Sequence, residues 1–192
     1  MKELYLFRHG QTDYNVKRAF YGSSDVPLNE TGIQQARTIQ IALSSIKIDT
    51  VYTSDLLRAK QTAKIVFPNF FSHPLPQLNE KGFGLWEGLD ANAIQEAFPI
   101  EWQAWLNDPF AYTPPQAEQF KLFEQRVLSG LNTILKQTQQ DKRIAIVAHL
   151  GVLRIIYQQL IDKQADFWSI DFPQGEVRIF SWYEEQWHIK KE

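Results

Sequence analysis

The chain has 192 residues, a formal net charge of −2 at pH 7 and a pI near 6.1. This charge balance provides no global basic field, so we expect neither general nucleic-acid binding nor attachment to an acidic membrane. The sequence contains no cysteine, which excludes thiolate catalysis, disulfides and thiolate metal sites.

The length is that of a single domain, and we expect residues 1–192 to form one. No apolar run approaches the length of a transmembrane helix. Residues 1–7 are too short and too acidic to be a signal peptide, so we expect a cytoplasmic protein. No feature of the sequence indicates an oligomeric state.

The first predicted element is a buried strand, the apolar run Leu4–Phe7. Arg8 and His9 follow it directly, and in open α/β sheets ligands bind beyond the carboxyl ends of the strands. His9 is therefore a candidate nucleophile. Thr12 and Asn15, in the loop that follows, offer a hydroxyl and an amide to the oxygens of an anion.

The next predicted element is a helix that begins near residues 29–31, where an asparagine or a threonine can cap it. It is expected to continue because apolar side chains recur at helical spacing, at Ala36, Ile39, Leu43 and Ile46. This stripe is expected to cover one face of the sheet.

Residues 49–53 are predicted to form a second strand, and Ser54 or Asp55 can cap the helix after it. Arg58 lies in the first turns of that helix. Because the helix begins where the strand ends, we expect Arg58 at the same sheet edge as His9.

Residues 67–77 contain three prolines and are predicted to form a loop that leads to a short edge strand at 75–78. Glu80 follows that strand. Residues 82–117 are rich in aromatic side chains and in prolines that break short helical pieces, so we predict a lid-like excursion from the sheet. Such an aromatic cluster is more often a local core than a ligand platform, and it can be both on different faces.

A long helix is predicted over residues 118–138, followed by the apolar run Ile144–Ala148, which is typical of a central parallel strand. His149 stands at the junction with a further helix. Residues 177–189 are predicted to form a hairpin. This alternation of strands and helices predicts an α/β fold, a three-layer α/β/α sandwich around a mostly parallel sheet.

Arg8, His9, Arg58 and His149 therefore converge on one predicted edge, with Glu80 as a fifth member. Two guanidinium groups match the tetrahedral oxygens of phosphate, so a small phosphomonoester is the expected ligand. His9 would attack phosphorus to form a phosphohistidine, and Glu80 would protonate the leaving alcohol and later activate water. The arginines and His149 can stabilise the transferring group without a metal ion or a cofactor.

Residues 8–15 resemble the signature of the histidine phosphatase superfamily, which includes cofactor-dependent phosphoglycerate mutases. Further similar segments follow in order over nearly the whole chain: 27–32, 54–63, 78–88 and 148–154. The resemblance implies a phosphoglycerate mutase-like fold and a phosphatase activity. It also implies that His9 is the phosphorylated nucleophile, Glu80 the proton donor, and that the phosphate contacts are Arg8, Asn15, Arg58 and His149.

Within that superfamily, the short chain and its excursion resemble the alpha-ribazole phosphatases of cobalamin biosynthesis, which implies hydrolysis of alpha-ribazole 5'-phosphate. The alternatives are a phosphoglycerate mutase, a broad-specificity phosphatase of sugars and metabolites, and a non-catalytic phospholigand-binding protein. The chain departs from many relatives in having Leu150 in place of a glycine after the second histidine. Residues 115–118 likewise replace a glycine-containing turn.

The remaining charged and titratable residues are weighed against this set. Glu87 flanks the same turn as Glu80 and competes with it for the role of the acid. Arg154 is expected on the surface, paired with a nearby acid. His73 and His188 are expected to be structural or solvated.

Overall fold

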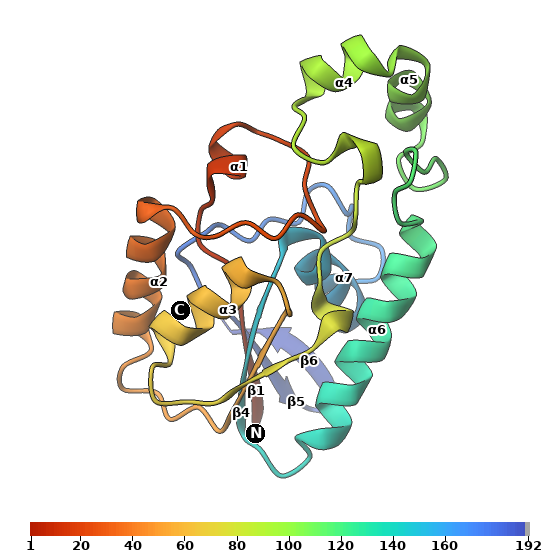
Figure 1. Cartoon of the computed structure of the whole chain (residues 1–192). Coiled ribbons are helices and arrows are strands. Elements are labelled where there is room, and N and C mark those ends of the chain that lie inside the picture. Colours follow the sequence, from red (N-terminus) through yellow and green to blue (C-terminus); the bar gives the residue numbers. More distant parts are fainter. Residues whose placement is uncertain (191–192) are drawn as a thin grey trace.

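A six-stranded sheet forms the centre of the computed structural model, which describes residues 1–190 (Figure 1). The strand order is β3-β2-β4-β1-β5-β6. Four strands run parallel: β1 (Lys2–Arg8), β2 (Thr50–Thr53), β3 (Ser72–Pro74) and β4 (Arg143–Ala148). The last two form the predicted antiparallel hairpin, β5 (Arg178–Tyr183) and β6 (Gln186–Ile189). The prediction of a mostly parallel sheet is confirmed.

Helices cover both faces of this sheet (Figure 1). On one face, α2 (Glu30–Ala42) and α3 (Leu57–Val66) pack against side chains that include Phe7 and Val147. On the other, α6 (Phe120–Gln137) and α7 (Leu150–Leu160) pack against Leu6 and Ile146. Alternate residues of β1 and β4 thus point into two separate cores, which is why residues 4–7 of β1 and 144–148 of β4 are uninterrupted apolar runs. This is the predicted three-layer sandwich.

The two helices on the first face, α2 and α3, are capped in different ways at their N-termini. Asn29 caps α2 by accepting the Gly32 N–H at 2.9 Å, and the helix ends at Ala42, so Ile46 lies beyond it. The prediction that Ser54 or Asp55 caps α3 is wrong. The N-cap of α3 is Leu56.

The backbone N–H of Leu57, the first residue of α3, donates to Asp25 Oδ1 at 2.6 Å. The Ser54 hydroxyl, in contrast, bonds to Asn79 and His149. Asp25, from a loop that is distant in the sequence, therefore caps α3 in place of Ser54 or Asp55.

The edge strand lies earlier in the chain than predicted. β3 ends at Pro74, and residues Pro76–Leu78 form a short 3₁₀ helix instead of the strand expected at 75–78. Pro76 is accommodated at the first position of this helix, where its missing N–H leaves no bond unmade. Leu78 is fully buried in the core beneath α6.

Residues 82–117 leave the sheet and carry α4 (Ala91–Ala97) and α5 (Pro99–Asn107). These helices lie beyond the carboxyl ends of the parallel strands, on the same side as the short helix α1 (Asp13–Val16) (Figure 1). Trp86, Ile94 and Trp102 are buried together as a small separate core. Much of the aromatic cluster is thus a local core, as expected. In residues 1–190, no helix combines the length and the apolar character needed to cross a membrane.

Candidate active site

His9 follows the end of β1 and is 2% exposed. Its Nδ1 lies 2.7 Å from the carbonyl oxygen of Gly10. Because a carbonyl oxygen can only accept a hydrogen bond, Nδ1 carries the proton of the neutral ring and Nε2 keeps its lone pair. Burial, together with the nearby Arg8 and Arg58 cations, holds the pKa of His9 well below its usual range. His9 is therefore a neutral imidazole whose Nε2 can act as a nucleophile.

Gly10 is needed here because another backbone passes very close to it. A Cβ at this position would lie 2.3 Å from the Gly32 carbonyl oxygen, at the start of α2. The Gly10 N–H donates to the Thr62 hydroxyl on α3 at 3.0 Å. These contacts fix the loop that carries His9 between two helices.

His149 is the N-cap residue of α7, and its ring centroid lies 5.0 Å from that of His9. The two sequence-distant histidines are thus brought together, as predicted. His149 Nε2 lies 2.7 Å from the Ser54 hydroxyl, whereas its Nδ1 is buried without a hydrogen-bond partner among the described residues. Burial, and then the Arg58 cation, lowers the pKa of His149 well below its usual value.

Arg58 lies at the same sheet edge and is 1% exposed. Its two terminal nitrogens donate to the carbonyl oxygens of Ser24 and Gly22, each at 2.8 Å, and its Cζ lies 4.7 Å from the centre of the Tyr21 ring. The Nε atoms of Arg8 and Arg58 are both buried with no partner within residues 1–190. Buried donors normally have partners, so these two guanidinium nitrogens indicate a place for an anion.

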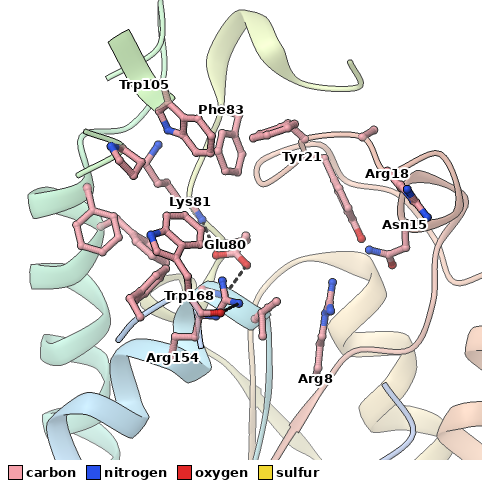
Figure 2. A pocket seen from close by; sticks show the side chains of 18 residues that line it. Arg8, Asn15, Arg18, Tyr21, Glu80, Lys81, Phe83, Trp105, Arg154 and Trp168 are labelled. Atoms are coloured by element: carbon pink, nitrogen blue, oxygen red, sulfur yellow. Dashed lines mark hydrogen bonds between the residues drawn. The ribbon is translucent and has the colours of Figure 1, made fainter. Parts of the chain in front are cut away.

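Glu80 faces this group across a cavity and is held by two backbone amides (Figure 2). Its Oε1 accepts the Lys81 N–H and its Oε2 accepts the Gly151 N–H, both at 3.0 Å. Gly151 belongs to the first turn of α7. A Cβ at Gly151 would lie 2.5 Å from Glu80 Oε1, so only glycine permits this approach. The close backbone contact with Glu80 is thus made by Gly151, whereas Leu150, which stands where many relatives have a glycine, lines the cavity.

Arg126, on α6, anchors the backbone that carries Glu80. It donates to the carbonyl oxygens of Gln77, Asn79 and Glu80, at distances from 2.6 to 3.0 Å. It also pairs with Glu118, whose carboxylate Oε1 lies 2.6 Å from the arginine Nε. The altered turn at residues 115–118 therefore leads into an ion pair that fixes the Glu80 segment.

Glu87, the competing acid, does not line the cavity. Its Oε1 accepts the N–H groups of Gly22, Ser23 and Phe83, and its Oε2 accepts the Ser24 N–H. Burial raises the pKa of Glu87, but these hydrogen bonds outweigh burial and lower it overall. Glu87 thus ties residues 22–24 to the excursion, and the geometry favours Glu80 as the acid.

Asn15 and Thr12 form the side of the site next to Arg8. Asn15 Oδ1 accepts from the Thr12 N–H and from Gln174 Nε2, both at 3.0 Å, and the side chain borders the cavity (Figure 2). The Thr12 hydroxyl is buried and bonds to Asn15 Oδ1 and to the Tyr21 hydroxyl. Thr12 therefore orders its neighbours, and its direct contact with phosphate stays a prediction.

The cavity has a volume of about 300 Å³. Arg8, Asn15 and Glu80 line one part of it, and aromatic side chains that include Trp105 and Trp168 line the other (Figure 2). His9 and Arg58 are buried and do not line the cavity, but both lie next to Tyr21, which does: the His9 and Tyr21 ring centroids are 6.5 Å apart, and Arg58 Cζ is 4.7 Å from the centre of the Tyr21 ring. Within residues 1–190, no group of three or more His, Asp or Glu side chains is placed to hold a metal ion.

The expectation that Arg154 is a surface residue paired with an acid is wrong. Its guanidinium donates to the Ile170 and Trp168 carbonyl oxygens and lies 5.4 Å from the centre of the Trp168 ring, at the cavity wall. The sequence held one signal, because Arg154 is the single charged residue of the apolar helix α7. Gln174 was also missed. Its Nε2 donates to the His9 carbonyl oxygen at 3.2 Å.

Comparisons with known proteins identify the family of this chain. The sequence profile of the histidine phosphatase superfamily (branch 1) matches residues 4–192. The chain is 33% identical, over 90% of its length and 86% of the relative, to the adenosylcobalamin/alpha-ribazole phosphatase of Escherichia coli. It is 29% identical, over 97% and 96%, to the 2,3-bisphosphoglycerate-dependent phosphoglycerate mutase of Chlamydia muridarum.

The fold is similar to solved structures as well. The crystal structure of the alpha-ribazole phosphatase from Shigella flexneri superposes with a TM-score of 0.90 at 30% identity, covering 98% of this chain and 94% of that one. The phosphoglycerate mutase from Bacillus anthracis superposes with a TM-score of 0.81 at 22% identity, which confirms the mutase-like fold. With a profile match over almost its whole length, the chain belongs to the histidine phosphatase superfamily and is a phosphatase.

Proposed function

We propose that this phosphatase works through a phosphohistidine at His9 and that its substrate is alpha-ribazole 5'-phosphate. One observation carries the mechanism: the neutral His9, with Nε2 unprotonated, lies near two buried arginine Nε atoms that have no partner within residues 1–190. A phosphoryl group bound there would satisfy both guanidinium groups and present its phosphorus to Nε2.

The chemistry runs in two displacements. In the first, Nε2 forms a bond to phosphorus while the bond from phosphorus to the ester oxygen breaks, and the departing alkoxide takes a proton from Glu80. In the second, water attacks phosphorus and gives a proton to the Glu80 carboxylate, and the bond to Nε2 breaks. Phosphate leaves and His9 is neutral again. Arg8, Arg58, Asn15 and His149 would hold the phosphoryl oxygens in both steps.

The substrate is argued from the aromatic end of the cavity. The alcohol part of alpha-ribazole 5'-phosphate is a ribose bearing a flat benzimidazole, and Trp105 and Trp168 offer ring surfaces beside the phosphate site. Relatives named for this substrate support the choice. Phosphoglycerates carry no ring, and the rings of sugar phosphates are puckered and not aromatic, so neither can stack a flat aromatic face on these surfaces.

We expect alpha-ribazole 5'-phosphate to exceed 3-phosphoglycerate in kcat/KM by about 10- to 100-fold, the equivalent of one stacked base. Replacing Trp168 by leucine should remove most of this preference, while kcat/KM for 3-phosphoglycerate stays within about twofold. The assay is phosphate release from each ester by both proteins. A higher value for 3-phosphoglycerate, or its isomerisation without phosphate release, would contradict the proposed substrate and favour a mutase. Tight binding without turnover would indicate a non-catalytic binding protein.

A further inference from the structure

A chain of hydrogen bonds runs from Asn79 through the Ser54 hydroxyl to His149. The Asp55 N–H donates to Asn79 Oδ1 at 2.8 Å, so this amide oxygen is an acceptor. The Ser54 hydroxyl lies 2.9 Å from the same oxygen and 2.7 Å from His149 Nε2. These hydrogen bonds therefore connect the end of β2, the Glu80 segment and the start of α7 at the buried Ser54 hydroxyl.

The direction of these bonds follows from the number of protons. A hydroxyl has one proton to donate, and Asn79 Oδ1 can only accept it. The Ser54 oxygen then accepts from the Leu56 N–H, at 3.1 Å, and from His149 Nε2. The proton of neutral His149 therefore lies on Nε2, and the buried Nδ1 carries a lone pair with no partner among the described residues.

A lone pair cannot donate to a phosphate oxygen. We propose that Ser54 and Asn79 are positioning residues that fix this tautomer, so that binding of a tetrahedral dianion must bring one proton from solvent onto His149 Nδ1. The inference rests on the proposed function, because it takes the anion to bind between His9 and His149. His149 would then contact phosphate only as an imidazolium.

The charges around His149 agree with this coupling. Burial lowers the pKa of His149 well below its usual range, and the Arg58, Arg8 and Arg126 cations add to this effect. A bound dianion supplies the opposite charge and favours the imidazolium. By linkage, a protein that takes up one proton on binding loses affinity for the anion about tenfold for each unit of rising pH, as long as the pH lies between the pKa of His149 in the free protein and its pKa with the anion bound.

The test uses sulfate, a tetrahedral dianion with no proton of its own. Titration calorimetry at about pH 7, where the lowered pKa leaves free His149 neutral, in buffers of different ionisation enthalpy gives the number of protons taken up per sulfate bound. We expect about one proton for the wild type. The His149→Gln variant should bind sulfate with an uptake near zero.

Two variants act on the tautomer without touching the anion. In Ser54→Ala, His149 loses its acceptor. In Asn79→Ala, the Ser54 hydroxyl loses its acceptor and becomes free to donate to Nε2. Either change lets the neutral ring carry its proton on Nδ1, so uptake should fall well below one, and affinity should change less with pH. Ser54→Thr keeps the hydroxyl and should retain the wild-type uptake.

The outcomes separate the two proposals. Sulfate that fails to bind the wild type overturns the anion site and, with it, the proposed function. Sulfate that binds without proton uptake overturns the inference alone. Proton uptake that persists in His149→Gln assigns the proton to His9. Proton uptake that persists in both Ser54→Ala and Asn79→Ala shows that the hydrogen bonds of Ser54 and Asn79 do not set the tautomer of His149. Each of these results would overturn the inference.

Discussion

The His9→Ala variant is expected to lose phosphatase activity by about 10⁴-fold or more in kcat/KM, because alanine offers no atom that can bond to phosphorus. The loss should extend to every substrate, including activated esters, since all of them must pass through the same nitrogen. The assay is release of inorganic phosphate by the purified variant, with circular dichroism to show that the fold is kept.

His73 provides a matched control. It is an exposed histidine on the edge strand β3, with its ring centroid 5.4 Å from that of Tyr52, and it lies outside the cavity. His73→Ala should retain wild-type kcat/KM within about twofold. Turnover by His9→Ala at the wild-type rate would show that the nucleophile lies elsewhere.

Replacing Glu80 by glutamine should lower kcat/KM for alkyl phosphates by about 10²- to 10⁴-fold, the usual contribution of a general acid. Glutamine can still accept the Gly151 N–H, so the local structure is kept, but it has no acidic proton to give. p-Nitrophenyl phosphate needs no such proton, because its leaving group is stable as an anion. For that ester kcat/KM should fall by less than about tenfold. An equal loss for both esters would argue against proton donation.

Gly151→Ala is the companion variant, because it displaces the carboxylate without removing it. The new Cβ would lie 2.5 Å from Glu80 Oε1 and 3.2 Å from Cδ. We expect the same dependence on the leaving group, with a smaller loss. Gly82→Ala is the control, since a Cβ there meets only the Ser23 side chain at 3.6 Å or more. A loss that does not depend on the leaving group would indicate a general structural defect.

Much of the fold was predictable because it depends on local patterns. The run Ile144–Ala148 is apolar at every position, and only a central strand covered on both faces needs that. Given parallel strands, His9, Arg58 and His149 had to meet at one edge, which is why the site could be assembled from sequence. The segment 75–78 was ambiguous, because two leucines three residues apart fit a 3₁₀ turn as well as a strand.

Other features depend on partners far away in the chain. The position of Ser54 in the sequence suits a helix cap. Its hydroxyl instead forms hydrogen bonds with Asn79 and His149, which lie 25 and 95 residues further along the chain. Arg154 finds its acceptors in the backbone at residues 168 and 170, and a main-chain carbonyl leaves no trace in the sequence. Sequence patterns therefore do not predict the role of a residue such as Arg154, which bonds to backbone carbonyl groups, or of Ser54, whose hydroxyl bonds to two distant side chains.

The Glu80→Gln variant also allows the most direct test of the phosphohistidine at His9. Given p-nitrophenyl phosphate labelled at phosphorus, it should complete the first displacement but lack the base for the second, so the intermediate should accumulate. The measurement is alkaline quenching followed by mass spectrometry of the peptides. We predict an acid-labile phosphoryl group on His9, approaching one per chain, and none in the variant that also carries His9→Ala. Label on another residue, or p-nitrophenol release with no label on the protein, would contradict the account.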